Sequence, residues 1–416
     1  MRRAWLRVAG TLFAVAWGGN EFTPLLVMYR VDQQMSALVV DLLLAAYVLG
    51  IVPGLLLGGP LSDRHGRRPL MLWAPVFGML GSAVLAAGSG EPAILAAGRV
   101  CSGIALGLVM AVGTSWIKEL SSDAPGSGPR RASMSLTAGF GLGAGVAAAL
   151  AQWGPWQAQL PYLVNIVLTA AAGVVLLSAP ETRPRSTTPG RLRDDLRIPA
   201  GRHRRFLLVV APTAPWVFGA AASAYAILPA LLSAQVPDLA IGLSGLMCLV
   251  ALGTGVGVQA LGRRLDRPRS ARGMVVAMAV TVPGMALAAL TATTRSPALG
   301  LVAAAVLGAA YGLLLVGGLQ EVQRIARPDD LAGLTAVYYS MSYLGFFVPA
   351  VLAALDPLLG YPLLFVAGAV LATASLVLVF YHRHQTLPAE PDQPHEPDRL
   401  NEPDQTHEPD QLSEPE

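Results

Sequence analysis

Long apolar runs separated by short polar segments dominate the pattern along the chain. A membrane-spanning helix needs about 20 mostly apolar residues. Twelve runs fit this requirement, and we predict spans at residues 9–29, 38–60, 70–88, 93–116, 132–152, 160–179, 206–231, 240–261, 273–292, 298–319, 332–354 and 361–381. The third run is short, and the seventh contains Pro212, Pro215 and Pro229. Prolines are tolerated in a span where neighbouring groups satisfy the freed backbone. The pattern predicts an all-α integral membrane protein with twelve transmembrane helices.

Composition supports this fold class. The chain has 416 residues, of which 54% are hydrophobic and 13% are charged, and its mean hydropathy is +0.54. Soluble domains carry about 25% charged residues. A soluble protein of this length with so few charges could not cover its surface, so the composition excludes that class.

The distribution of basic residues gives the orientation of the spans. Cytoplasmic loops of membrane proteins carry an excess of Lys and Arg. If the N-terminus is cytoplasmic, all but three of the 29 Lys and Arg residues fall in cytoplasmic segments, the exceptions being Arg30, Arg99 and Arg295. A wrong number of spans would destroy this alternation. We therefore predict twelve spans with both termini in the cytoplasm.

A polar, Arg-rich and Pro-rich segment divides the spans into two sets of six. The boundaries predict an N-terminal six-helix bundle at 1–180, a cytoplasmic central loop at 181–205, a C-terminal six-helix bundle at 206–382 and a tail at 383–416. The tail repeats Glu-Pro-Asp with a period of six residues. Acidic and proline-rich segments without apolar residues cannot bury a core, so we expect the tail to be disordered.

The charged loop between the second and third runs carries the most specific motif. It reads Gly-Pro-Leu-Ser-Asp-Arg-His-Gly-Arg-Arg over residues 59–68. This matches, nearly position for position, a signature of the major facilitator superfamily, so the chain resembles these polytopic secondary transporters. The resemblance implies two pseudo-symmetric six-helix bundles that rock about a central site. The segment Leu61–Arg64 has a faint echo at Arg264–Arg267, after the eighth span.

In the resembled family this loop forms a cytoplasmic latch between the two halves, strongest in the outward-open state. By match to the motif, the latch residues here are Gly59, Asp63, Arg64, Gly66, Arg67 and Arg68. The glycines are expected to permit tight backbone turns. The carboxylate of Asp63 is expected to face the positive end of a helix.

Two ionisable residues lie well inside predicted spans, away from the span ends. Glu21 is in the first span and Arg99 is in the fourth. Ionisable groups inside a membrane are costly and are functional by default. At 1.5 Å per residue their depths differ by only about 4 Å, which is within the reach of the side chains. We expect a Glu21–Arg99 pair in which protonation of Glu21 frees Arg99 and couples transport to protons. A structural ion pair without a part in transport is the alternative.

Glycine patterns in the fourth and fifth spans add to the resemblance. Arg99, Gly103 and Gly107 resemble a family motif associated with proton coupling. The fifth span partly resembles an antiporter motif at Gly139 and Gly143, but Ala144 stands where that motif has proline. Small residues at this spacing also permit close helix contact, so packing is the alternative. Glu119 after the fourth span, and Pro180-Glu181-Thr182 after the sixth, are short segments that also resemble this superfamily.

The second half contributes aromatic residues in place of charges. Candidate residues for a substrate cavity are Asn20, Trp216, Tyr225, Tyr311 and Tyr339. Phe218 and Tyr343 are further candidates of the same kind. Aromatic walls with few polar groups suit an amphipathic or apolar small molecule. Packing is the alternative for any one of them.

The leading hypothesis is a secondary transporter that exports a small amphipathic compound in exchange for protons. A metabolite importer, either a symporter or a facilitator, is the alternative, and a membrane sensor on a transporter scaffold is an alternative of another class. The six histidines lie in loops or in the tail, and the chain has no phosphate-binding loop of the type G-x-x-x-x-G-K. We therefore do not expect an enzyme, a metal site or a cofactor, and the energy source would be the proton gradient.

The expected partners are the small-molecule substrate, protons and the lipid bilayer, but not nucleic acid, and we expect a monomer. The chain has one lysine against 28 arginines. This bias is typical of GC-rich genomes. With no targeting segment apparent, it indicates the inner membrane of a bacterium.

Overall fold

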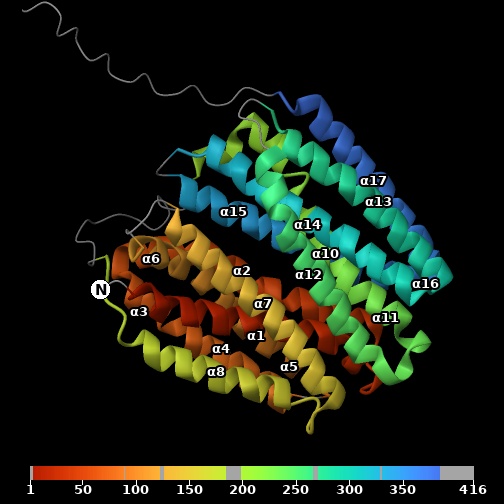
Figure 1. Cartoon of the computed structure of the whole chain (residues 1–416), viewed down its shortest axis with the longest axis horizontal. Coiled ribbons are helices and arrows are strands. Elements are labelled where there is room, and N and C mark those ends of the chain that lie inside the picture. The colour runs from red at the N-terminus through yellow and green to blue at the C-terminus, as the bar shows by residue number, and fades with distance from the viewer. Residues whose placement is uncertain are drawn as a thin grey trace, which may run out of the picture.

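The computed structural model describes residues 3–88, 90–121, 126–183, 198–265, 270–327 and 330–384. Figure 1 shows two groups of helices side by side, one in red to yellow and the other in green to blue. Most of the predicted central loop and nearly all of the predicted tail lie outside the described residues, as does part of the echo at 264–267.

The first group contains the first six predicted spans. Its helices are α1 (Trp5–Val31), α2 (Ala37–His65), α3 (Arg67–Met71), α4 (Trp73–Ala87), α5 (Pro92–Leu108), the π-helical turn η1 (Val109–Gly113), α6 (Thr114–Glu119), α7 (Ser127–Trp153) and α8 (Leu160–Leu176). The third span is α3 followed by α4, and the fourth runs through α5, η1 and α6. α1 packs against α7, and α2 packs against α5.

The second group contains the last six predicted spans. Its elements are η2 (Pro199–Arg202), η3 (Phe206–Val210), α10 (Ala214–Ala222), η4 (Ser223–Ile227), α11 (Leu228–Leu232), η5 (Ser233–Gln235), η6 (Pro237–Leu239), α12 (Ala240–Leu265), α13 (Arg272–Thr294), α14 (Pro297–Ile325), α15 (Leu331–Tyr343), η7 (Leu344–Phe347), α16 (Val348–Leu359) and α17 (Tyr361–His382). The seventh span is the most broken, because its prolines lack the N–H groups that a continuous helix needs. The Thr213 hydroxyl donates to the carbonyls of Val209 and Val210 in this stretch, at 2.8 and 2.9 Å.

Ten helical stretches in the described part of the chain are long and apolar enough to cross a membrane. Of the two remaining predicted spans, α8 has only 17 residues. The other, α1, has 27 residues but includes the polar Asn20 and Glu21. The prediction of an all-α membrane protein is confirmed.

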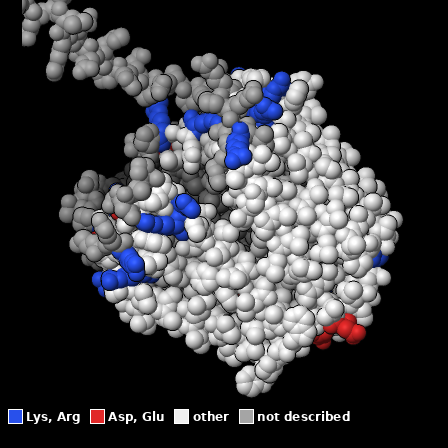
Figure 2. All heavy atoms as spheres, in the orientation of Figure 1, with Lys and Arg blue, Asp and Glu red and all other residues white. Residues whose placement is uncertain are grey.

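The outer surface has the character that a bilayer requires. Many large apolar side chains are exposed, for example Leu358 at 78%, Val370 at 63% and Leu371 at 62%. In Figure 2 most of the blue Lys and Arg side chains gather at one end of the molecule, and a broad white surface with few charged side chains covers most of the rest. The surface is hollowed between the two groups of blue side chains.

The two groups of helices touch at mid-depth and at the end away from these basic residues. The Gln152 side chain at the end of α7 donates to the Asp238 carbonyl at 3.0 Å and accepts from the Gly242 N–H at 2.8 Å. Deeper in the molecule, the Asn20 amide donates to the Cys248 sulfur at 3.7 Å. The Tyr343 hydroxyl donates to the Met110 sulfur at 3.4 Å. Contacts to sulfur are weak hydrogen bonds, so the polar contacts at mid-depth are weak.

A buried ion pair holds the basic end of the second group together. The Arg205 guanidinium, before η3, lies 2.5 Å from a carboxylate oxygen of Glu321 on α14. Their side chains are 0% and 2% exposed, and Arg324 contacts the same carboxylate at 2.6 Å. Removing one partner of a buried pair leaves a charge that is costly to bury.

We expect Glu321→Gln to destabilise the protein by about 3–5 kcal/mol, because Arg205 loses its buried charge partner. Thermal unfolding of the purified protein in detergent checks this, with Glu91→Gln, an exposed carboxylate at the start of α5, as the matched control. An unfolding temperature of Glu321→Gln equal to that of the control would contradict the assignment.

Candidate functional site

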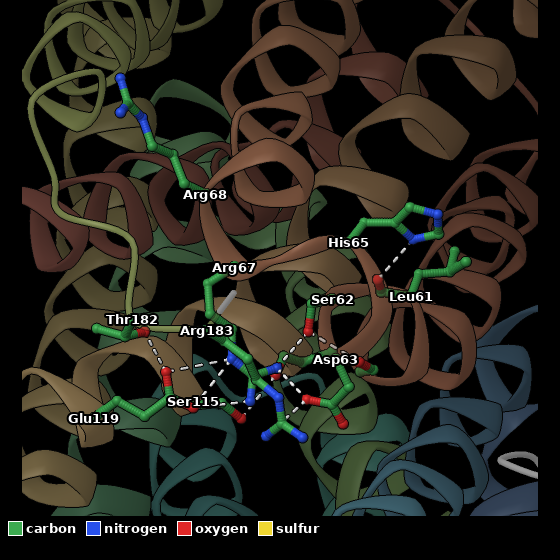
Figure 3. A network of polar contacts seen from close by, with 12 residues as sticks. Leu61, Ser62, Asp63, His65, Arg67, Arg68, Ser115, Glu119, Thr182 and Arg183 are labelled. Atoms are coloured by element: carbon green, nitrogen blue, oxygen red, sulfur yellow. Dashed lines mark hydrogen bonds and ion pairs between the residues drawn. The ribbon is translucent and has the colours of Figure 1, made fainter. Parts of the chain in front are cut away.

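Arg67 is the centre of the predicted latch. Its guanidinium lies 2.7 Å from Asp63 on the last turn of α2 and 2.8 Å from Glu119 at the end of α6. The Thr182 hydroxyl donates to the same Glu119 carboxylate, and Arg183 lies 3.3 Å from Asp63 (Figure 3). The structure thus joins the loop after α2 to the segments after α6 and α8, whose Glu119 and Pro180-Glu181-Thr182 the sequence singled out.

Glu181 fastens the turn between α2 and α3. Its carboxylate oxygens accept the backbone N–H groups of Arg67 and Arg68 at 3.0 and 2.8 Å. Partial burial acts to raise the pKa of Glu181, but hydrogen bonds from the backbone N–H groups of Arg183, Arg68, Arg67 and Thr182 lower it below its ordinary value. A lowered pKa means that this stabilisation is present at neutral pH and is lost as the pH falls through the folded-state pKa.

Three of the predicted latch residues, Asp63, Arg67 and Arg68, bond to neighbouring segments of the chain. Their described ion pairs and hydrogen bonds reach the first group of helices and the segment 177–183 that follows α8. Arg64 is half-buried on the last turn of α2. A contact across to the other half, as the resemblance implies for another conformation, stays a prediction.

The two glycines of the motif differ in their roles. Gly66 joins α2 to α3 with φ +98°, and a Cβ there would lie 2.8 Å from the Glu181 carboxylate. Gly59 lies inside α2, and a Cβ there would meet nothing within 4 Å. The prediction that Gly59 permits a tight turn is therefore wrong, because the helix continues to His65.

Glu21 and Arg99 are both 0% exposed in the first group of helices. The Ser82 hydroxyl lies 3.1 Å from Glu21 Oε1 and 2.9 Å from Asn165 Oδ1, whose amide donates to the Ala14 carbonyl at 2.9 Å. The other oxygen of Glu21, Oε2, has no hydrogen-bond partner among the described residues. α1, α4 and α8 together position this carboxyl.

Arg99 lies over the faces of two aromatic rings. Its guanidinium carbon is 4.1 Å from the centre of the Tyr47 ring and 4.5 Å from that of Phe22. Its Nη1 is 3.5 Å from the Gly19 carbonyl, and its Nε has no partner in the described part of the chain. Arg99 is near Glu21 but forms no ion pair with it or with any other described carboxylate. The expected direct Glu21–Arg99 pair is wrong, because ring faces hold the guanidinium instead.

Close glycine contacts place the Tyr47 ring over Arg99. A Cβ on Gly103 would lie 2.2 Å from the Tyr47 carbonyl, and one on Gly50 would lie 2.1 Å from the Val100 carbonyl, so α2 and α5 touch through their backbones. Gly139 and Gly143 on α7 meet α1 in the same way. The packing alternative therefore accounts for the small residues of both glycine patterns.

A central cavity opens between the two groups of helices. Its cavity volume is about 30 Å³, so its walls lie close together in this structure. Its walls come from both halves and consist of Gly19, Asn20, Thr23, Leu44, Tyr47, Arg99, Phe140, Phe218, Tyr225, Leu252, Tyr311, Tyr343 and Phe346. Arg99 is the single charged residue among them.

The cavity includes three of the five predicted substrate-cavity residues, Asn20, Tyr225 and Tyr311. Trp216 and Tyr339 are not in its wall. The Trp216 indole turns away to donate to the Ser375 hydroxyl at 3.2 Å. Tyr339 packs beside Tyr338, with ring centres 5.9 Å apart.

Sequence reasoning missed Tyr47, Phe140 and Phe346 in the wall. Each stands in an apolar run in which aromatic residues have no distinguishing pattern. One signal for Tyr47 was its position three residues before Gly50. Gly50 contacts the fourth span, and residues three apart share a helix face.

Comparison with known proteins decides the family. The family model described as Major Facilitator Superfamily matches residues 8–349. The chain belongs to the major facilitator superfamily. It is accordingly a multi-pass secondary transporter of small molecules and not an enzyme.

Solved structures agree on the fold. The nucleoside transporter NupG is 13% identical with a TM-score of 0.67, covering 92% of this chain and 98% of its own. The human organic anion transporter MFSD10 (TETRAN) is 19% identical with a TM-score of 0.63, covering 91% and 99%. A peptide transporter POT in complex with sulfate is 15% identical with a TM-score of 0.69, covering 91% and 93%. No match was found among curated protein sequences. At these identities the likeness establishes the fold of this superfamily and no substrate.

We expect Gly66→Ala and Gly59→Ala to differ in stability, although both alter the same motif. Gly66→Ala places a side chain at positive φ against Glu181 and costs about 1–3 kcal/mol. Gly59→Ala replaces a glycine inside a helix and is neutral or stabilising by up to about 1 kcal/mol. Thermal unfolding of the two variants in detergent measures the difference. Equal effects on the unfolding temperature would show that the turn at Gly66 tolerates a side chain.

Proposed function

We propose that this protein is a proton-coupled transporter of a small amphipathic organic compound, with Glu21 as the proton-binding group. The observation that carries the proposal is the placement of a buried carboxyl with one unpartnered oxygen behind the wall of the central cavity. An ionised group inside a membrane protein is costly unless it is neutralised. Protonation neutralises Glu21. Arg99 in the cavity wall lies near Glu21, so protonation changes the electrostatic environment of its guanidinium.

Alternating access explains how the cavity would work. The two groups of helices meet at mid-depth and at the end away from the basic residues, through few polar contacts. By the positive-inside rule, the hollow between the basic side chains faces the cytoplasm. The six-helix bundles at 1–180 and 206–382 would rock about the cavity. Asp63, Arg64, Arg67 and Arg68 would then latch across the halves in the opposite state.

Export in exchange for protons is the first candidate for the direction. It is supported by the resemblance of residues 59–68 and of Arg99, Gly103 and Gly107 to drug and metabolite exporters. Uptake of a metabolite together with a proton is the second candidate. It is favoured by Arg99, which lines the cavity without a carboxylate partner and could hold a negatively charged compound. We propose that the protein works as a monomer in a bacterial inner membrane, with both termini in the cytoplasm.

Glu21→Gln tests the proton coupling. In proteoliposomes that contain a pH-sensitive dye, we expect a panel of amphipathic anions, neutral compounds and cations to include at least one that moves protons through the wild type. Glu21→Gln should reduce this movement to the protein-free background, because glutamine cannot carry the proton. The direction of proton flow relative to the added compound distinguishes exchange from co-transport.

Glu91→Gln is the control, since this carboxylate is exposed at the start of α5. If folded Glu21→Gln still moves protons with the compound, Glu21 is not the coupling group. If the folded wild type moves no protons with any compound of the panel, the protein is not proton-coupled.

A further inference from the structure

The central cavity presents a cation without a matching anion. Arg99 is fully buried, lines the cavity and forms no ion pair with a described carboxylate. Its Nε donates to no acceptor in the described part of the chain. The guanidinium lies over the ring faces of both Tyr47 and Phe22. The guanidinium therefore keeps a hydrogen bond that the described residues do not use and that a ligand in the cavity could accept.

A second unpartnered donor lies beside the first. The Tyr47 hydroxyl is buried in the same cavity wall and has no hydrogen-bond partner among the described residues. A buried polar group without a partner costs about 1–3 kcal/mol. Two such groups in one wall, on neighbouring helices α2 and α5, indicate that an absent ligand supplies the acceptor.

The facing wall is apolar and aromatic. The rings of Phe218 and Tyr343 stack with centres 4.3 Å apart, and Phe346 and Tyr311 lie 4.9 and 5.7 Å from Phe218. These four residues belong to the second group of helices, so the cavity joins a charged donor pair from one half to a ring surface from the other. Such a surface binds flat apolar groups.

Charge decides which class of compound fits. A cation would be repelled by Arg99, since no described acidic side chain lines the cavity to offset the repulsion. A neutral compound would bring no counter-charge to the guanidinium, and the nearby Glu21 supplies none when it is protonated. An oxyanion accepts from both donors, and hydrogen bonds between two charged groups are stronger than neutral ones.

We propose that the cavity binds an organic monoanion, with a carboxylate or similar oxyanion on Arg99 and Tyr47 and a flat apolar body against Phe218, Tyr343 and Phe346. This inference rests on the proposed function for the statement that the cavity is the transport site. Its binding chemistry does not depend on whether protons are coupled.

The test compares probes of equal shape and different charge. Benzoate and 2-naphthoate, their neutral amides, and the corresponding ring methylammonium compounds are titrated into the full chain in lipid nanodiscs by calorimetry. We expect at least one carboxylate to bind about tenfold or more tightly than its amide. We expect no binding of the ammonium compounds.

The variants assign the preference to residues. Arg99→Gln should abolish the preference for the carboxylate, and Tyr47→Phe should weaken it while keeping the ring. Arg383→Gln is the control, because Arg383 also stacks on a ring, that of Phe380, but does not line the cavity. If Arg99→Gln does not fold, Tyr47→Phe and the comparison of probes on the wild type still decide the question.

Equal or tighter binding of the amides or ammonium compounds would overturn the inference. The inference would also be overturned if no carboxylate bound to wild-type protein whose cooperative unfolding shows that it is folded. A carboxylate preference with no effect of Glu21→Gln on proton movement would support this inference and refute the proton coupling. Proton movement driven by a cation, without a carboxylate preference, would refute this inference and leave the coupling standing.

Discussion

A fully buried carboxyl and a fully buried guanidinium lie near one another in the first bundle without touching. Charge inside a membrane is costly, and the surrounding structure stabilises each group separately. The Ser82 hydroxyl contacts both Glu21 and Asn165. The rings of Tyr47 and Phe22 contact the Arg99 guanidinium.

The helix packing around these two groups follows from this arrangement. The Tyr47 ring can lie over Arg99 because Gly50 and Gly103 let α2 and α5 meet backbone to backbone. Gly18 beside Asn165 leaves room for that side chain against α1, since a Cβ there would lie 2.7 Å from the Asn165 oxygen. Small residues in membrane helices give close approach, and here the close approach places the ring and the amide that stabilise the two ionisable groups.

Each half is also tied together at its basic end, by Arg67 with Asp63 and Glu119 in one half and by Arg205 with Glu321 in the other. Glu119 and Glu321 both lie near the end of the fourth span of their half. These ties hold each bundle as a unit, whereas the polar contacts between the bundles at mid-depth are weak hydrogen bonds to sulfur. Rocking of one bundle against the other therefore leaves the strongest polar contacts unbroken.

Hydropathy and the alternation of basic loops predicted the fold. A long apolar run in lipid must satisfy its own backbone hydrogen bonds, and it does so by forming a helix. Motif matching located the segments that meet at Arg67. The sequence could not predict the contact of Arg99, because depth along a helix says nothing about rotation around it or about which ring lies nearby. For the same reason Trp216 was expected in the cavity but points to Ser375, while Tyr47 was missed.

The central claim is that Glu21 gains and loses a proton within the folded protein. Infrared difference spectroscopy of the purified protein in lipid nanodiscs, recorded while the pH is varied, observes the protonated carboxyl directly. The account predicts a carboxyl band that disappears reversibly as the pH rises, that is absent from Glu21→Gln and that persists in Glu91→Gln. If wild type and Glu21→Gln give identical spectra over the pH range in which both stay folded, Glu21 does not change its protonation state and the account is wrong.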